Sequence, residues 1–328
     1  NSQTLAGSAF YPINVPLDTS EVDILPQCVL IGYAIALRLA REGAAVLVSS
    51  RKQQNVDTAV AKLKGLGLNV EGVVCHVGKK EDRTLLFEAA AKTFGGLDIL
   101  VSNAAVNPSV GPVLETEEST WDKIFEINVK CAYLLAQESL PLLRKSGGGS
   151  IVFVSSIAAY QPMPILGAYS VSKTALLGLT KAASLDLAPE NIRVNCLAPG
   201  IVPTKFSGPL TGTDSAREMA LSAVPMGRLG KADEMGATVA FLVSDDAGYI
   251  TGETIVASGG MASRCGARGE SHRRGQVTRS YNLIFIVIDT SKKKFHLGPG
   301  PSPEGVMTPP PPWIRPCFQS EFSMNLRH

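Results

Sequence analysis

The stretch of sequence that decides the fold runs from residue 150 to residue 200: SIVFVSSIAAYQPMPILGAYSVSKTALLGLTKAASLDLAPENIRVNCLAPG. It opens on an apolar run rich in β-branched residues, SIVFVSS (150–156). A helix-period segment follows over 168–188, and a second apolar run, IRVNCLAPG, occupies 192–200. Continuous apolar strands joined by a long helix predict a βαβ unit in a parallel sheet that is covered on both faces.

The same alternation extends over most of the chain. Strand-like apolar runs occupy 44–50, 70–77, 98–105 and 254–260, and helix-period segments lie at 32–43, 54–66, 81–95, 118–145 and 231–243. This order predicts an α/β fold in which one doubly wound parallel sheet forms a single Rossmann-type domain. Such a sheet needs one more strand before its first helix. The short run EVDIL (21–25) is the only candidate, so we expect a degraded first strand.

The two ends of the chain differ from this domain, which we predict to span residues 21–262. Residues 1–20 are polar, lack a period and are expected to be irregular. Residues 263–328 are basic, and eight of the twenty-one prolines fall within 298–316. Such a composition cannot bury enough apolar surface to offset its backbone entropy, so we predict a disordered tail. The apolar run at 281–289 is the exception and could add an edge strand or aggregate.

Composition excludes several classes of protein. The 328 residues are 45% apolar, so the chain as a whole is neither disordered nor fibrous, and a net charge of +2 favours no polyanion partner. Only His76 precedes the tail, which excludes a histidine-based triad and a multi-histidine metal site, and we predict no metal. The six cysteines form no C-x-x-C pair and are expected to be reduced thiols of an intracellular protein. No apolar run approaches the roughly 18 residues that span a membrane.

Tyr169 and Lys173 are the first candidates for chemistry. They lie four residues apart in the segment Y-S-V-S-K, which places both side chains on one face of the predicted helix. An ammonium beside a phenol favours the phenolate and lowers the tyrosine pKa from its usual value of about 10. The alternative is an amphipathic helix whose lysine snorkels to solvent.

Two further polar residues lie where the fold favours a ligand site. Ser156 ends the strand SIVFVS, and a doubly wound sheet binds ligands at the carboxyl ends of its strands. A serine there can donate a hydrogen bond to a substrate carbonyl, or it can cap a helix. Asn128 falls in the middle of a predicted helix, an unfavourable place that indicates a side chain kept to hold water or bend the helix.

These residues form part of a motif set that resembles the short-chain dehydrogenases/reductases. The set follows the family's order over about residues 29–260 and comprises S-N-A-A (102–105), I-N-V-K with Asn128, S-S with Ser156, Y-x-x-x-K, and A-P-G-I-V-P-T (198–204). Three more segments resemble the branch formed by members 2 and 4 of that family, which are carbonyl and retinal reductases that use NADPH: SSRKQQNVD (49–57), VCHVGK (74–79) and SKTALLGLTK (172–181).

The resemblance implies an enzyme that reduces carbonyl compounds to alcohols by hydride transfer, with ketones, dicarbonyls and retinal-like aldehydes as substrates. Tyr169 would donate the proton, and Lys173 would bind the nicotinamide ribose and lower the tyrosine pKa. Ser156 would polarise the carbonyl, and Asn128 would position a water in the proton relay.

The resemblance also implies an assembly and leaves the compartment open. Family members of this kind form homodimers or homotetramers through the helices at about 118–145 and 168–188 here. Their branch ends near a peroxisomal-type S-R-L signal, whereas here Ser263 and Arg264 run on into Cys265. We therefore expect an intracellular protein, with mitochondrial, peroxisomal and cytoplasmic locations all open.

The cofactor is predicted from the residues after the second strand. An NAD enzyme places an acidic residue there, whereas a cation accommodates the 2′-phosphate of NADP. This chain has Ser50, Arg51 and Lys52 and no acid, so we predict NADP. The resemblance places His76 and Val77 beside the adenine, where the family commonly has an Asp, so we expect an altered contact there. It adds Thr204 at the nicotinamide carboxamide and the motif residues Gly32, Asn103, Pro199, Gly200 and Val202.

The phosphate-binding loop departs from the family's T-G-x-x-x-G-x-G. The chain reads L-P-Q-C-V-L-I-G over 25–32, so only Gly32 of the three glycines remains. Side chains at Gln27 and Leu30, and the missing N–H of Pro26, would obstruct a pyrophosphate.

Two interpretations remain open. One is an active NADPH-dependent carbonyl reductase. The other is a catalytically impaired family member that binds cofactor poorly and acts at most as an oligomer subunit or interaction partner. A nucleic-acid-binding tail has little in its favour, because residues 261–328 hold ten basic and four acidic residues and few aromatics.

Overall fold

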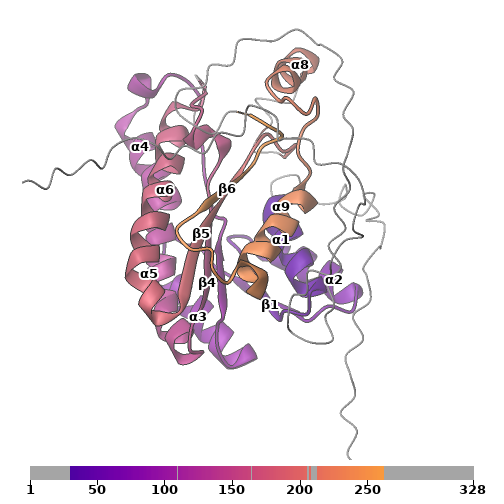
Figure 1. Ribbon diagram of the computed structural model, residues 1–328, viewed down its shortest axis with the longest axis vertical. Coiled ribbons are helices and arrows are strands. Elements are labelled where there is room, and N and C mark those ends of the chain that lie inside the picture. The colour runs from indigo at the N-terminus through magenta and orange to yellow at the C-terminus, as the bar shows by residue number, and fades with distance from the viewer. Residues whose placement is uncertain (1–29, 109, 164, 205–206, 208–212, 262–328) are drawn as a thin grey trace, which may run out of the picture. The chain divides into compact units, whose positions relative to one another are not determined.

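The computed structural model describes residues 30–261 except 109, 164, 205–206 and 208–212 (Figure 1). Helices and strands alternate along this part of the chain. The segment predicted to be irregular (1–20), the predicted first strand (21–25) and the predicted tail (263–328) lie outside the described residues.

The helices and strands predicted within the described residues are confirmed, and each begins within two residues of its expected position, whereas the helix at Asp214–Ser222 was not predicted. The strands are β1 (Val46–Ser50), β2 (Val70–Val74), β3 (Ile99–Ser102), β4 (Gly149–Val154), β5 (Ile192–Pro199) and β6 (Thr254–Ala257). The α-helices are α1 (Leu30–Arg41), α2 (Gln53–Gly65), α3 (Lys80–Phe94), α4 (Glu118–Phe125), α5 (Cys131–Lys145), α6 (Gly167–Leu187), α8 (Asp214–Ser222) and α9 (Ala232–Val243). Short 3₁₀ helices are η3 (Val113–Glu115), η5 (Ile157–Ala159), η6 (Ala188–Glu190) and η7 (Asp245–Ala247).

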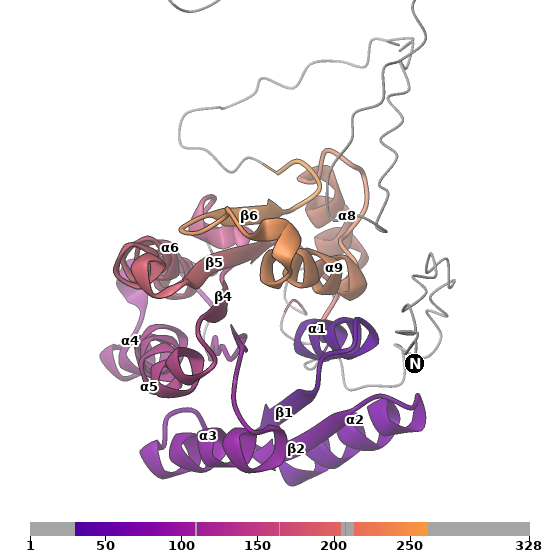
Figure 2. The same ribbon diagram turned by 60° about the horizontal axis from the view of Figure 1, so that its bottom comes forward.

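All strand pairs are parallel, as expected, but the described residues form two sheets where we predicted one. Strands β3, β4, β5 and β6 are neighbours in that order, whereas β1 pairs with β2 alone (Figure 2). In a doubly wound sheet the first strand lies between the second and the fourth. In this order a first strand would belong between β1 and β3. Val46, Leu47 and Val101 on these two strands are only half-buried.

Helices cover both faces of the four-stranded sheet. Helices α1 and α9 lie side by side on one face, and α5 and α6 lie on the other (Figures 1 and 2). Side chains of β4 alternate between the two cores: Ile151 and Phe153 face the α5–α6 side, whereas Val152 and Val154 face the α1–α9 side. This two-sided burial explains why the strand reads as one continuous apolar run.

The helix predicted over 118–145 is interrupted. Helix α4 is followed by a π-helical segment, η4 (Glu126–Lys130), and then by α5. Asn128 lies in the middle of η4, so the polar residue that looked misplaced in a regular helix marks the irregular turn. Single π-helical turns inside α-helices are frequent at functional sites. Among the described residues, no helix is long and apolar enough to cross a membrane.

Candidate active site

A cavity of about 160 Å³ lies at the carboxyl ends of β3, β4 and β5, where the fold predicted a ligand site. Its wall combines residues from the ends of these strands with residues from α1, from α6 and from the segments after β4 and β5. Nine of the residues predicted from the sequence line it: Gly32, Asn103, Ser156, Tyr169, Lys173, Pro199, Gly200, Val202 and Thr204.

Tyr169 and Ser156 meet in this cavity. Tyr169 comes from the first turn of α6, and Ser156 directly follows β4. A hydrogen bond joins the two side chains. Ser156 also caps η5, because its Oγ accepts a hydrogen bond from the backbone N–H of Ala158 at 3.1 Å. The capping role and the site role of Ser156 are therefore both present, since a hydroxyl oxygen can accept and donate together.

Lys173 is buried one helical turn after Tyr169, so the snorkelling alternative is wrong. Only 2% of the residue is exposed, and its Nζ donates a hydrogen bond to the backbone oxygen of Val154 at 2.8 Å. Removal from water disfavours the ammonium, and this desolvation lowers the pKa of Lys173 to about 8. A second serine, Ser155, fixes the same turn of α6, because its Oγ donates to the backbone oxygen of Lys173 at 2.8 Å.

The pKa of Tyr169 corrects the electrostatic argument made from the spacing. We expected Lys173 to lower it. Burial acts more strongly and raises the pKa of Tyr169 above its usual value, and the hydrogen bond with Ser156 opposes this rise only in part. At neutral pH the hydroxyl therefore keeps its proton.

Asn128 lies behind the cavity and not in its wall. The Asn128 Oδ1 accepts from the backbone N–H of Val106 at 2.8 Å, and its Nδ2 donates to the Val106 oxygen at 3.0 Å. The same Nδ2 donates to Ser172 Oγ at 3.0 Å. Asn128 thus ties η4 to α6 and to the segment after β3, and it is 1% exposed.

Two glycines of the wall show close approaches that a side chain would prevent. A β-carbon at Gly200 would lie 2.6 Å from Ser258 Cα, and one at Gly32 would lie 2.9 Å from Asn103 Nδ2. Opposite, Thr204 is held by Ser207, whose Oγ accepts from the Thr204 N–H at 2.8 Å. The segment that carries Thr204 therefore has a defined backbone beside the cavity.

The remaining predicted cofactor residues do not line the cavity. They gather at the carboxyl ends of β1 and β2, which pair in parallel. The backbone oxygen of Ser50 accepts from Cys75 N–H at 3.0 Å, so the segment with His76 and Val77 continues from this pair. Arg51 and Lys52 are exposed at the start of α2.

Sequence reasoning missed part of the wall and of its support. Ile31, Ala105, Ile157, Ala158 and Ile201 are small or apolar residues that also line the cavity, together with Val154, Ser155, Met163, Leu166 and Ser207. Met163 and Leu166 add to the apolar part of the wall. The serines carried no signal, because serine is common at strand ends and in loops. The described residues contain no cluster of three or more His, Cys, Asp or Glu that could hold a metal ion.

The described region matches known proteins. Residues 30–262 match the family model described as enoyl-(acyl carrier protein) reductase. Dehydrogenase/reductase SDR family member 4 of Bos taurus is 55% identical over 248 residues, covering 76% of this chain and 89% of that protein. Tropinone reductase-like 3 of Erythroxylum coca is 53% identical over 234 residues, covering 71% and 90%.

A solved structure agrees with these matches. A protein from Sinorhizobium meliloti 1021, described as a short-chain alcohol dehydrogenase, has a TM-score of 0.67 and 35% identity, covering 70% of this chain and 91% of that one. The family model spans more than two thirds of the chain, and the curated relatives are more than half identical to it. The chain therefore belongs to the short-chain dehydrogenase/reductase family, whose members are oxidoreductases that use a nicotinamide cofactor.

Proposed function

We propose that this protein reduces carbonyl compounds to alcohols with NADPH as the hydride donor. Its substrates are ketones, dicarbonyls and retinal-like aldehydes. One observation carries the proposal: Ser156, Tyr169 and Lys173 converge on a single cavity that is otherwise mostly apolar. A proton donor and a hydrogen-bond donor beside an apolar surface suit a carbonyl group attached to an apolar body.

The cavity wall fits the nicotinamide end of the cofactor. Gly32 and Gly200 let the segments of the wall pack closely, because a β-carbon there would collide with Asn103 and Ser258. Lys173 supplies a buried ammonium for ribose hydroxyls, and Thr204 supplies polar groups for the carboxamide. The fit cannot be extended along the pyrophosphate, because residues 25–29 lie outside the described part of the chain.

The bound cofactor supplies the hydride that reduces the carbonyl carbon. Ser156 donates a hydrogen bond to the carbonyl oxygen and favours the charge that grows there. The Tyr169 hydroxyl gives its proton to the same oxygen, so each carbonyl reduced consumes one hydride and one proton. Because burial keeps Tyr169 protonated at neutral pH, the proton-donating form is the populated one.

The preference for NADPH over NADH is supported by charge. Arg51 and Lys52 are exposed at the carboxyl end of β1, and among the described residues neither takes part in an ion pair. Two such cations suit a 2′-phosphate, whereas they offer nothing that accepts a hydrogen bond from a ribose 2′-hydroxyl.

We propose that the protein acts inside the cell as a homodimer or a homotetramer. Helices α5 and α6 carry exposed apolar side chains: Tyr133 is 46% exposed, Val171 42% and Leu185 78%. Apolar residues outside the core are expected when a second face of a helix meets a partner. Sedimentation at micromolar concentration tests this, and a pure monomer would exclude it.

The catalytically impaired alternative is favoured by a separate observation. Only Gly32 remains of the three glycines that the family's phosphate loop would place over 25–32. A chain of this kind would retain the side chains of the cavity yet bind cofactor poorly and serve only as a subunit or an interaction partner.

One experiment separates the two. NADPH is titrated into the full chain while cofactor fluorescence is followed, and turnover of an apolar ketone is then measured by loss of NADPH absorbance. The proposal expects saturable binding and turnover. Binding without turnover, or no binding at millimolar NADPH, supports the impaired alternative.

A further inference from the structure

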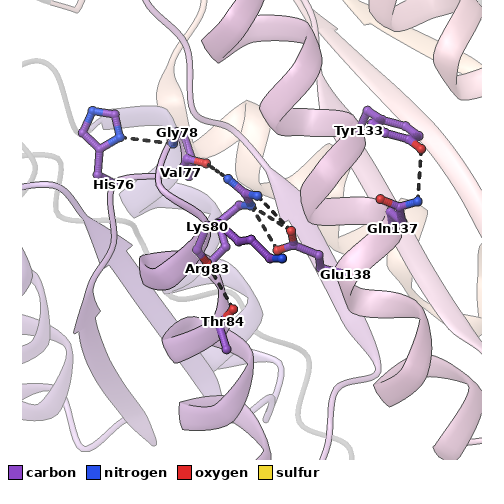
Figure 3. Close-up of polar contacts among 9 residues, drawn as sticks. All are labelled: His76, Val77, Gly78, Lys80, Arg83, Thr84, Tyr133, Gln137 and Glu138. Atoms are coloured by element: carbon purple, nitrogen blue, oxygen red, sulfur yellow. Dashed lines mark hydrogen bonds and ion pairs between the residues drawn. The ribbon is translucent and has the colours of Figure 1, made fainter.

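An ion pair outside the cavity, between a buried arginine and a half-buried glutamate, has no role in the chemistry proposed above. Arg83 of α3 is 3% exposed and faces Glu138 of α5 (Figure 3). The two residues are 55 positions apart in the chain. Because the charge of an arginine is costly to bury, a guanidinium in such a place calls for an explanation.

The contacts of Arg83 are divided between a carboxylate and a backbone oxygen. Its Nε and Nη2 donate to Glu138 at 3.0 Å and 2.9 Å, which is a two-pronged pairing. Its third nitrogen, Nη1, donates to the backbone oxygen of Val77 at 2.7 Å. The planar guanidinium has a fixed fork, so the pairing with Glu138 sets the direction in which Nη1 points.

Val77 lies in the short loop that follows β2. Asp82 holds the start of this loop, because its Oδ2 accepts from the backbone N–H of His76 at 2.8 Å. The ring of His76 folds back, and its Nδ1 accepts from Gly78 N–H at 3.1 Å (Figure 3). A β-carbon at Gly78 would lie 2.9 Å from the His76 ring, so the glycine leaves room for it. Arg83 is thus one of three side chains that fix His76–Gly78.

This loop lies beside the proposed site for the adenosine half of the cofactor. Cys75, immediately before it, donates its N–H to the Ser50 oxygen, which places the loop next to the strand end that carries Arg51 and Lys52. These two cations are our candidates for the 2′-phosphate. The loop and the cations therefore share one corner of the fold, remote in sequence from Tyr169.

We propose that Arg83 is a positioning residue, anchored by Glu138, that holds the loop His76–Gly78 in the shape that receives the adenine. The inference rests on the proposed binding of NADPH and goes beyond it, because it assigns a role to residues that line no part of the cavity. Without the bond from Arg83, the Val77 carbonyl loses a buried partner and the loop relaxes toward other conformations.

The test uses the full chain and two probes that each represent one half of the cofactor. Adenosine 2′,5′-bisphosphate reports on the adenosine half, and reduced nicotinamide mononucleotide on the other; both affinities are measured by calorimetry. The variants are Arg83→Met, Arg83→Lys and Glu138→Gln. Arg144→Met is the matched control, since Arg144 forms a similar two-pronged pair with Glu190 on the exposed surface.

We expect Arg83→Met to weaken binding of adenosine 2′,5′-bisphosphate by tenfold or more and to leave the mononucleotide within twofold. Arg83→Lys and Glu138→Gln should give intermediate losses, and Arg144→Met none. Hydrogen exchange should also show faster exchange of the His76 and Gly78 amides in Arg83→Met. Arg83→Lys keeps the positive charge, and Glu138→Gln keeps the shape of the glutamate side chain. If Arg83→Met does not fold, the binding of the two probes is compared in these two variants.

Each contrary result has a distinct meaning. Equal weakening of both probes would show a general loss of structure and overturn the positioning role. Unchanged binding of adenosine 2′,5′-bisphosphate in all three variants would overturn it as well, while the proposed function stands. If the unaltered chain binds neither probe, the proposed function fails and the adenine assignment falls with it.

Discussion

The Nζ of Lys173 lies 5.6 Å from the centre of the Tyr169 ring, one turn further along α6. Both side chains are buried, and burial acts on them in opposite directions. It raises the pKa of Tyr169 and lowers that of Lys173, because each neutral form is the one that tolerates removal from water. Near neutral pH, Tyr169 is therefore a neutral phenol, and the neighbouring Lys173 loses its proton at a pH of about 8.

Replacement of the phenol tests its role as proton donor. Tyr169→Phe removes one oxygen and should keep the fold, since the ring packs with Ala158 and Leu166. Carbonyl reduction should fall by roughly 10²- to 10⁴-fold, the usual contribution of a positioned acid. Initial rates with NADPH and an apolar ketone measure the loss. Tyr160→Phe, which alters a half-buried tyrosine outside the cavity wall, is the control and should react at the normal rate. Near-normal turnover in Tyr169→Phe would move the donor elsewhere.

The lowered pKa of Lys173 predicts how stability depends on pH. In the unfolded chain the group loses its proton near 10.5, and in the folded chain near 8. Between these values the unfolded state binds more protons, so the free energy of unfolding rises with pH. The gain should be on the order of 2 kcal/mol by pH 10, and it is lost as the pH falls through 8. From about pH 9 the raised pKa values of the buried thiols Cys75, Cys131 and Cys196 act in the other direction, because the unfolded thiols ionise first. Above pH 10 the raised pKa of Tyr169 does the same.

Urea denaturation of the cofactor-free chain from pH 7 to pH 10 measures this dependence. Lys173→Met removes the titrating group and should flatten the profile. Lys181→Met changes an exposed lysine of the same helix and should leave the rise intact. A profile that stays steep in Lys173→Met would assign the titration to another group.

Asn128 is predicted to matter for stability as well as for activity. Its side chain makes three hydrogen bonds, one to the buried Ser172 and two to the backbone of the half-buried Val106. Asn128→Ala leaves those groups without partners, at about 1–3 kcal/mol for each that water does not reach. Ser139→Ala removes a single bond within α5 and should cost about 1 kcal/mol. Denaturation curves compare the two, and equal losses would contradict the bridging role of Asn128.

Features of the fold and of the site that depend on neighbouring residues could be predicted from the sequence, whereas features that depend on contacts between distant residues could not. Period and composition are local, so the strands and most of the helices of the described region were predicted closely, although α8 was not. The convergence of Ser156 with Tyr169 followed from the rule for strand ends. Arg83 gave no signal, because its partner Glu138 lies far away in the chain and a helical Arg usually faces solvent. The π-helical turn at Asn128 likewise depends on distant segments, because Asn128 bonds to Val106 and Ser172.

Reversal of charge at Arg51 tests cofactor selectivity. Arg51→Asp places an acceptor where a ribose 2′-hydroxyl would lie and repels a 2′-phosphate. The ratio of kcat/KM for NADPH to that for NADH should fall by tenfold or more. Arg41→Asp makes the same charge change at an exposed position at the end of α1 and should leave the ratio unaltered. Equal use of NADPH and NADH by the unaltered chain would already contradict the assignment.

The last prediction concerns the incomplete phosphate loop, on which the choice between the two interpretations depends. A pyrophosphate needs two or three backbone N–H groups at close range, and the chain keeps only Gly32 of three glycines over 25–32. We therefore expect NADPH affinity at least tenfold weaker, about 1.4 kcal/mol, than in a relative that has all three. Restoring T-G-x-x-x-G-x-G across 25–32, after an apolar strand in place of EVDIL, should strengthen binding.

Restoring the glycine loop together with an apolar first strand should also raise the melting temperature of the protein. A complete strand between β1 and β3 would cover their half-buried side chains, Val46, Leu47 and Val101 among them. Fluorescence titration and thermal denaturation measure the two gains, which should persist when residues 265–328 are deleted, since we assign the tail no part in the site. The decisive comparison is with the unaltered chain. If it already binds NADPH at low micromolar concentration and restoration adds nothing, the phosphates are bound in another way, and the expectation of poor cofactor binding is wrong.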